Sequence, residues 1–286
     1  MHIPYSDNKN QALFGETNKT VPLVYFNIIN LKKGESYEYQ LSKHESSVVP
    51  ATGIVEITVE DNKLGQIGKR TTDVWDGEPE GSYIPTNSKC KITCLSDSSE
   101  CFIAGGIYEK KLEPFLVLKE ELDVVQYGSD DTKTHRKIKH ILGAKHHDQV
   151  GRLLVNELYT VGAGGWSGFP PHKHDTDDLP QETRHDEVYN YRFKPGHGFG
   201  VQIMQSEDEK EGHGYQLFNG STIAINKGYH PCVVAPGYEM YYFTILVGLS
   251  QRSLIQSFQK THAYQLETIP GIKAVSYTHL TLPTMS

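Results

Sequence analysis

The hydrophobic residues of this chain occur in short runs that are separated by glycine, proline, asparagine and aspartate. Runs rich in β-branched or aromatic residues include 23–29, 53–59, 153–161, 200–204 and 240–247. Short runs of this composition, bounded by turn-forming residues, are typical of β-strands. The 3.6-residue period of a helix is weak throughout, and its best candidate is the segment 120–125. The pattern therefore predicts an all-β protein.

The predicted strands form two groups on either side of a polar, charged stretch. The first group extends from about residue 23 to 116, and the second begins near Arg152. We expect two β-sandwich domains, an N-terminal one at 1–120 and a C-terminal one at 151–274, joined by a linker at 121–150. Ten of the fourteen histidines lie between His135 and His230. Any histidine site is therefore expected in the second domain, with the first domain free of metal.

The last residues are set apart from this pattern. Residues 275–284 resemble the translation of a common transposase sequencing adapter. We expect 275–286 to be an artefact and the native C-terminus to be missing, and we exclude this segment from the functional argument.

Composition and charge narrow the class of protein. The formal net charge is −7 and the lysines and arginines are scattered, which disfavours a nucleic-acid partner because phosphate binding needs a positive patch. The chain has neither a basic, apolar leader at its start nor a run of eighteen apolar residues, so we expect a cytoplasmic protein without a membrane partner.

Four potential metal ligands occur in order along the second half. His172 and His174 are one residue apart, and because side chains alternate along a strand, both point to one face while Lys173 points away. Glu187 opens a β-rich run, and His230 follows a Gly-Tyr turn after another predicted strand. A single histidine is usually a solvated surface residue, but this constellation predicts a shared metal ion.

The ligand set also limits the metal and its use. Imidazole and carboxylate without cysteine suit zinc, manganese, iron or nickel, and four protein ligands leave open positions on a five- or six-coordinate ion. Open positions imply chemistry on a bound substrate, whereas structural zinc sites are more often closed by cysteines. The cysteines Cys90, Cys94, Cys101 and Cys232 are not spaced for such a site, and we expect them to be buried free thiols.

Several motifs resemble the 5-deoxy-glucuronate isomerase family of inositol catabolism. In the second half they are GGWSGFPPHKHD at 164–175, EVYNYR at 187–192, GFGVQ at 198–202, GYHP at 228–231 and PGYEMYY at 236–242. In the first half, LGQIGKR at 64–70, DVWDG at 73–77 and SYIP at 82–85 resemble the metal-free domain of that family. The resemblance covers nearly all of residues 20–250.

The resemblance implies a bicupin fold, that is, two β-barrel or jelly-roll domains with the metal site in the C-terminal cupin. The family's ligands fall on the same four residues, His172, His174, Glu187 and His230, with zinc as the first choice of metal and manganese or iron as alternatives. Cupins bury strand edges by pairing, so a homo-oligomer is also expected.

The implied reaction is an aldose–ketose isomerisation, an intramolecular oxidoreduction that converts 5-deoxy-glucuronate to 5-dehydro-2-deoxy-gluconate. A divalent ion would act as a Lewis acid and stabilise the enediolate that forms when the C2 proton leaves. A base then moves this proton to C1. Glu187 is a candidate base if it is weakly coordinated, and a nearby carboxylate or a metal-bound hydroxide are equal alternatives.

Strand parity suggests which side chains reach a small anionic sugar-acid substrate. Tyr189 and Tyr191 share the face of Glu187, so they either bind substrate hydroxyls or pack inside the barrel. Arg192 has the opposite parity and is expected to point outward. Gln202 lies in a family-like segment and is a further candidate for substrate binding, and the residue that binds the substrate carboxylate is left unassigned.

Two other functions fit the same ligands. One is the 4-deoxy-5-hexosulose-uronate ketol-isomerase of pectin degradation, which acts on a different keto-uronate. The other is a cupin oxygenase or sugar sensor, because the same ligands can hold iron and a fold alone does not decide a reaction.

Overall fold

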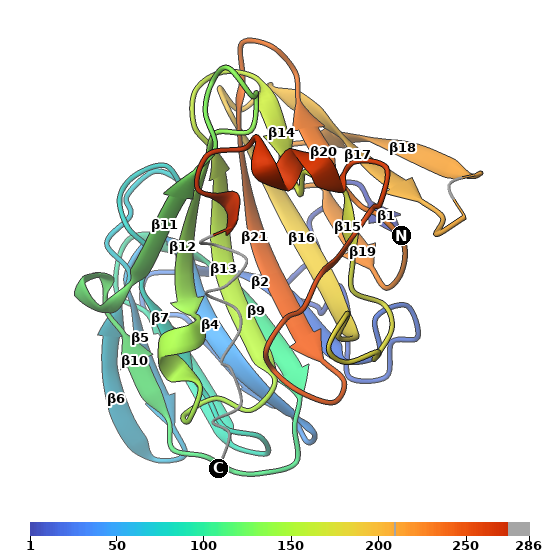
Figure 1. The fold of residues 1–286 in the computed structure, drawn as a ribbon. Coiled ribbons are helices and arrows are strands. Elements are labelled where there is room, and N and C mark those ends of the chain that lie inside the picture. Colours follow the sequence, from blue (N-terminus) through green and yellow to red (C-terminus); the bar gives the residue numbers. More distant parts are fainter. Residues whose placement is uncertain (209, 274–286) are drawn as a thin grey trace.

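The computed structural model describes residues 1–208 and 210–273, so the expected artefact at 275–286 lies outside the described residues. Antiparallel strands dominate the structure, and the helical parts are the short 3-10 turns η1 (Lys119–Glu121), η2 (Ala144–His146) and η3 (Ala263–Glu267). The prediction of an all-β protein is confirmed. Figure 1 shows the N-terminal strands beside a second, larger group of strands.

The N-terminal half is a sandwich of two sheets with its own apolar interior. The strands of one sheet, in spatial order, are β2 (Val24–Lys32), β9 (Ser98–Ile107) and β4 (His44–Thr52), and those of the other are β3 (Ser36–Gln40), β8 (Lys89–Cys94), β5 (Val55–Val59) and β6 (Asn62–Ile67). A ribbon of β7 (Gly81–Tyr83) and β10 (Phe115–Val117) lies beside them. Alternating residues of β5, Val55, Ile57 and Val59, are buried in this interior, as period-two patterning requires.

The C-terminal half is built around a seven-stranded sheet. Its strands, in spatial order, are β1 (His2–Ile3), β19 (Thr222–Ile225), β16 (His185–Lys194), β21 (Glu239–Gly248), β13 (Leu153–Thr160), β12 (Arg136–Leu142) and β11 (Asp123–Tyr127). A second sheet contains β14 (Gly165–Ser167), β20 (Cys232–Val234), β17 (Phe199–Gln205) and β18 (Gly212–Phe218), and a short ribbon pairs β15 (His172–Lys173) with β22 (Ser257–Phe258).

The two halves share one hydrophobic core between their facing sheets. Phe26 of β2 and Phe102 of β9 pack against Phe243 of β21, with 4.6 Å between the ring centroids of Phe102 and Phe243. Along β21, residues 241, 243, 245 and 247 face this shared core, whereas 240 and 242 belong to the interior of the C-terminal half. The sheet that carries the second half's interior is thus supported from behind by the first half.

The segment 121–150, which we expected to be a linker, instead contributes β11 and β12 to the seven-stranded sheet. The segment 120–125, the best helix candidate, forms the end of η1 and the start of β11. Its many charges suggested a solvated connection, but several of them are paired. Lys139, for example, is buried and forms an ion pair with Glu78 at 2.9 Å.

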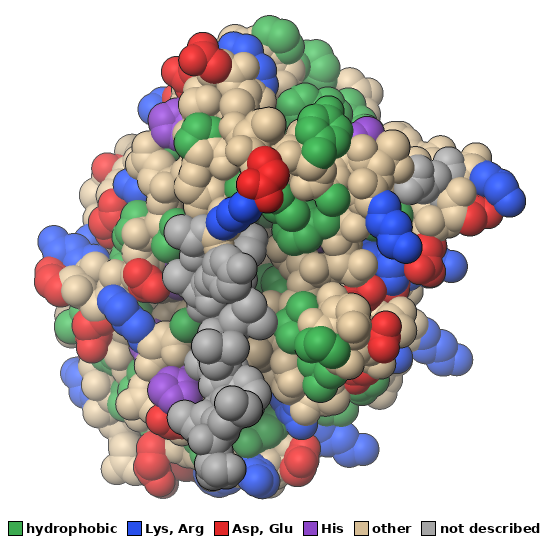
Figure 2. Space-filling model, viewed as in Figure 1, with side chains coloured by type: hydrophobic (Ala, Val, Ile, Leu, Met, Phe, Trp, Pro, Cys, Tyr) green, Lys and Arg blue, Asp and Glu red, His purple; other side chains and the backbone are tan. Residues whose placement is uncertain are grey.

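The cysteines and the surface agree with the sequence analysis. All four cysteines are free and buried. Figure 2 shows acidic and basic side chains interspersed over the visible face. No helix among the described residues is long and apolar enough to cross a membrane.

A buried ion pair joins the two halves. Nη1 and Nη2 of Arg70 donate to the two carboxylate oxygens of Glu157 on β13 at 2.7 and 2.6 Å. The hydroxyls of Tyr159 and Tyr241 donate to the same carboxylate. Burial alone would raise the pKa of Glu157, but the attraction of Arg70 outweighs it and lowers this pKa.

We predict that this pair contributes to acid stability. Because the pKa of Glu157 is lower in the folded than in the unfolded protein, its contribution is full above the ordinary value of 4.5 and is lost as the pH falls through the folded value. Replacing Glu157 by Gln leaves Arg70 buried and unpaired, and should cost about 3–5 kcal/mol at pH 7. Urea unfolding at several pH values should show this loss, together with a shallower decline of stability in acid.

The exposed Glu113 provides the control, since Glu113→Gln should change neither quantity. An unaltered unfolding free energy in Glu157→Gln would contradict the importance of the pair.

Candidate metal centre

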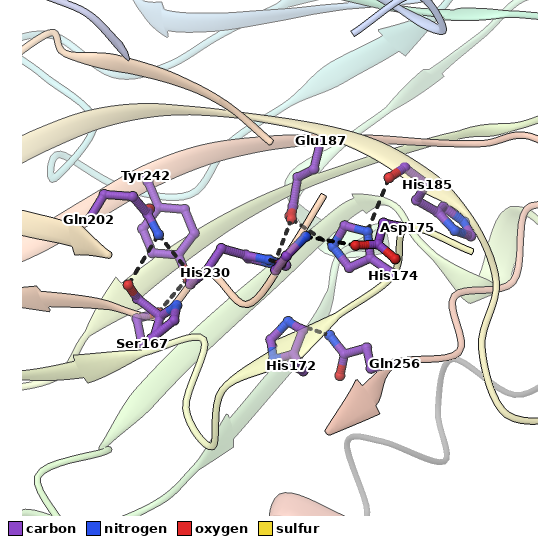
Figure 3. A network of polar contacts seen from close by, with 12 residues as sticks. Ser167, His172, His174, Asp175, His185, Glu187, Gln202, His230, Tyr242 and Gln256 are labelled. Carbon is purple, nitrogen blue, oxygen red and sulfur yellow. Dashed lines mark hydrogen bonds and ion pairs between the residues drawn. The ribbon is translucent and has the colours of Figure 1, made fainter. Parts of the chain in front are cut away.

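The four predicted ligands lie together inside the C-terminal half. His172 lies on β15 with His174 just after it, Glu187 is on β16, and His230 is in the turn before β20. All four are buried, with at most 8% of any of these residues exposed. The three imidazoles and the carboxylate point toward one another (Figure 3).

The distances are short enough for one shared ion. A ring nitrogen of each histidine lies within 4.8 Å of those of the other two. Oε2 of Glu187 is 3.0 Å from Nε2 of His174 and 3.4 Å from Nε2 of His230. Two ligand atoms that bind one zinc ion at about 2.1 Å lie about 3.4 Å apart in a tetrahedral arrangement, and the two Glu187 separations match this value.

Backbone carbonyls fix the proton position on all three imidazoles. Nδ1 of His172 lies 3.3 Å from the Pro170 oxygen, Nδ1 of His174 lies 3.1 Å from the His185 oxygen, and Nδ1 of His230 lies 2.9 Å from the Gly228 oxygen. Because a carbonyl oxygen only accepts hydrogen bonds, each Nδ1 carries a proton and donates it. With Nδ1 as the donor, Nε2 is the ring nitrogen of each histidine that can bind a cation, which is the arrangement that metal-binding histidines commonly show.

Two further observations favour a divalent cation. The Nε2 atom of His230 is buried and has no hydrogen-bond partner among the described residues. Burial, together with His230 and His174, lowers the pKa of His172 far below its usual value and keeps its imidazole neutral. A buried lone pair without a donor is costly, and a bound cation removes this cost. The buried histidine triad is therefore a candidate site for a divalent metal ion.

The carboxylate of Glu187 remains ionised in this setting. Burial alone would raise the pKa of Glu187, but the contacts with His174 and His230 outweigh it and lower this pKa. Burial would likewise lower the pKa of His174, yet the neighbouring carboxylate raises it. The pair thus shares a proton when no other cation is between them, and metal binding would displace that proton.

Lys173 points away from the cluster, as strand parity predicts. Its ammonium group donates to Asp175 at 2.9 Å and to the buried Glu182 at 2.8 Å. Glu182 also accepts hydrogen bonds from the backbone N–H groups of Asp175 and Thr176. These contacts tie the loop that ends at Glu182 to the strand of the two ligands.

A cavity opens from the ligands into the interior of the C-terminal half. His172, Glu187 and Tyr189 contribute to its wall. The sequence analysis missed several polar residues that also line it: Arg136, His140, Asn156, Thr244 and Gln256. Nε2 of Gln256 lies 3.0 Å from Nε2 of His172, and Nδ1 of His140 lies 2.7 Å from Oδ1 of Asn156. Arg136 and His140 lie on β12, in the segment that we expected to be a linker, and no local pattern of its sequence identifies them.

The other two predicted substrate-binding residues are not part of the described lining. The hydroxyl of Tyr191 donates to Gln202 at 2.5 Å, and the amide of Gln202 donates to the backbone oxygens of His230 at 2.7 Å and Pro231 at 3.1 Å. This network favours a role in positioning the turn that carries His230. Arg192 faces away from the cavity, as its parity predicts, and binds Glu100 of the N-terminal half at 2.8 Å.

The fold and the site define a class of protein, a β-sandwich candidate metalloenzyme in which two of the predicted ligands, His172 and Glu187, line an interior cavity. The chain belongs to the KduI/IolB family, whose model matches residues 3–265. The recognition of this family from the sequence motifs is confirmed.

Relatives with assigned names agree with this membership. The 5-deoxy-glucuronate isomerase of Bacillus subtilis (strain 168) is 31% identical over 239 residues, covering 82% of this chain and 85% of the relative. That of Geobacillus kaustophilus (strain HTA426) is 32% identical over 250 residues, covering 85% of this chain and 87% of the relative. These names support the prediction of an isomerase.

Solved structures support the fold. An IolB-like protein from Salmonella typhimurium LT2 superposes with a TM-score of 0.76 at 28% identity, covering 85% of this chain and 89% of the other. A variant of Bacillus subtilis oxalate decarboxylase superposes with a TM-score of 0.63 over 99% of this chain and 84% of the other, at 11% identity. The second likeness concerns the fold alone and supports the expected bicupin.

We predict that His174→Ala loses its metal. Removing one of four ligands takes away a large part of the affinity, so metal content after dialysis, measured by atomic emission, should fall to near zero together with activity. His147→Ala is the control, because His147 is exposed and pairs only with its neighbour Asp148 among the described residues, so metal content should be unchanged. Full metal occupancy in His174→Ala would refute the ligand assignment.

Proposed function

We propose that this protein is a metal-dependent aldose–ketose isomerase that converts 5-deoxy-glucuronate to 5-dehydro-2-deoxy-gluconate in inositol catabolism. The observation that carries the proposal is the buried cluster of three histidines, whose ring nitrogens lie within 4.8 Å of one another beside a cavity. The family membership and the names of the relatives indicate which reaction such a site performs. Two finer expectations belong to the proposal, namely a homo-oligomer and a cytoplasmic location.

In this proposal His172, His174, His230 and Glu187 hold the metal, with zinc as the first choice and manganese or iron as alternatives. When bound, the ion supplies a Lewis acid that polarises the substrate carbonyl. The chain itself contributes fixed geometry, since each imidazole is held by a backbone carbonyl and the Glu182 contacts hold the strand of the first two ligands.

The isomerisation moves one proton between carbons and one between oxygens. The proton that leaves C2 is returned to C1, while the O2 hydroxyl proton passes to O1, so that the aldehyde becomes a primary alcohol and C2 becomes a ketone. Glu187 is the only carboxylate among the described residues that line the cavity, and its lowered pKa keeps it in the ionised form that a base requires. We therefore assign the carbon-to-carbon transfer to Glu187.

Tyr189 is assigned to substrate binding. Its ring lies in the cavity wall, and burial together with the charge of Glu187 raises the pKa of its hydroxyl far above the usual value. A phenol that stays protonated can donate a hydrogen bond to a substrate hydroxyl beside the carboxylate. Tyr191 and Gln202 are assigned an indirect role. Gln202 donates to the backbone oxygen of His230, and Tyr191 donates to Gln202.

Proton NMR tests the reaction directly. The full chain, incubated with 5-deoxy-glucuronate, should remove the aldehyde and hydrate signals and produce those of the ketose. Chelator treatment should abolish the conversion, and added zinc, manganese or iron should restore it.

Failure of a folded, metal-loaded sample to convert 5-deoxy-glucuronate would overturn the proposal. Conversion of 4-deoxy-5-hexosulose uronate instead would support the ketol-isomerase of pectin degradation. Oxygen uptake with iron would indicate an oxygenase, and ligand-dependent stabilisation without turnover would indicate a sensor.

The role of Glu187 is tested by Glu187→Gln, which keeps an oxygen ligand but cannot accept the proton. With metal content measured in the same sample and reloaded where needed, kcat should fall by about 10²–10⁴-fold. Asp178→Asn in the exposed loop is the control and should leave kcat unchanged. A metal-loaded Glu187→Gln that keeps kcat within a few-fold of the original would transfer the proton step to another cavity residue, with His140 the first to test.

A further inference from the structure

A buried arginine lies in the same cavity as the candidate metal ligands. Arg136 begins β12, is 4% exposed, and shares the cavity wall with His172 and Glu187. Its side chain points inward because residues 136, 138 and 140 of this strand all line the cavity. A cationic group is therefore present deep in an interior that is otherwise largely aromatic and aliphatic.

The guanidinium is only partly satisfied by the protein. Nη1 donates to the hydroxyl of Tyr127 at 2.8 Å, and Nη2 donates to the hydroxyl of Tyr242 at 2.7 Å. Nε is buried and has no partner among the described residues. A guanidinium carries five N–H donors, and the two phenols accept only two of them. Donors therefore remain for a further acceptor.

Two other buried arginines and the partly buried Arg252 show how such a charge is compensated in this chain. Arg70 is paired with Glu157, Arg192 is paired with Glu100, and Arg252 donates to the backbone oxygens of residues 142, 143 and 153. Within residues 1–208 and 210–273, no ion pair between Arg136 and a carboxylate is found. A buried cation without an anion is costly, so its presence in a cavity points to an anionic ligand.

The position of Arg136 relative to the histidines defines a two-ended site. The hydroxyl of Tyr242 contacts Arg136, the rings of Tyr242 and Tyr189 are 4.6 Å apart, and the ring of Tyr189 is 6.5 Å from that of His230. Two aromatic rings thus separate the guanidinium from the ligand cluster. Tyr242 is seen in Figure 3 on the side of His230 away from His174, with its hydroxyl next to Ser167.

We propose that Arg136 binds the carboxylate of an open-chain sugar acid whose carbonyl end lies at the histidine cluster. Tyr127 and Tyr242 fix the plane of the guanidinium, so that Nε and an adjacent Nη face the carboxylate as a bidentate pair. This inference rests on the proposed function for the identity of the substrate, and it makes Arg136 the residue that selects acids over neutral sugars.

The test separates binding from turnover. Two inert probes are used with metal-loaded protein: the acid obtained by reducing C1 of 5-deoxy-glucuronate to an alcohol, and the carboxamide of that acid. By calorimetry the original protein should bind the acid at least about 30-fold more tightly than the amide, and Arg136→Gln should bind both equally. Arg136→Lys should restore part of the preference, because it keeps the charge but not the bidentate geometry.

Arg192→Gln is the matched control, since Arg192 is a similarly buried arginine that faces away from the cavity, and it should keep the preference for the acid. Kinetics with 5-deoxy-glucuronate should show a KM at least about 30-fold higher in Arg136→Gln with unchanged metal content. Equal binding of acid and amide by the original protein, or an acid preference that survives in Arg136→Gln, would overturn the proposal. Selective acid binding without turnover would support carboxylate binding by Arg136 and would refute the proposed reaction.

Discussion

The alternation of side chains along β13, β21 and β16 is the constraint on which the rest of the structure depends. Each of these strands presents one set of residues to the core shared with the N-terminal half and the other set to the cavity. On β16, for example, Val188 packs in the shared core, while Glu187 and Tyr189 on either side of it line the cavity. The N-terminal half thereby supports the sheet from behind, and hydrophobic packing sets the positions of the functional side chains.

Much of the candidate metal centre was predictable from the sequence because it follows from local rules. The His-x-His spacing places His172 and His174 on one face whatever the remainder of the fold, and parity alone identified Arg192 as facing away from the cavity. The Gly-Tyr turn before His230 is also recognisable in the sequence. In the structure, the backbone oxygen of Gly228 accepts a hydrogen bond from the His230 ring. The proton positions could not be predicted, because they depend on which backbone oxygens lie beside each Nδ1.

The polar residues that β12 contributes to the cavity, Arg136 and His140, were not predictable in the same way. Arg136 and His140 lie in a segment whose charges suggested a solvated linker, and nothing local shows that it pairs with β13. Its burial depends on partners that are distant in sequence, such as Glu78 for Lys139 and Asn156 for His140. A charged segment can be recognised as a buried strand only when the groups that compensate its charges are known. Those partners are brought together by the tertiary structure.

The alternation along β21 also has an evolutionary consequence. A one-residue insertion or deletion in the strand would move Tyr242 and Thr244 into the shared core and turn Phe243 toward the cavity, which would damage packing and site at once. Exchanges of one side chain for another change only one face at a time. Divergence within this strand is therefore restricted to substitution, whereas changes in chain length are confined to the turns at its ends.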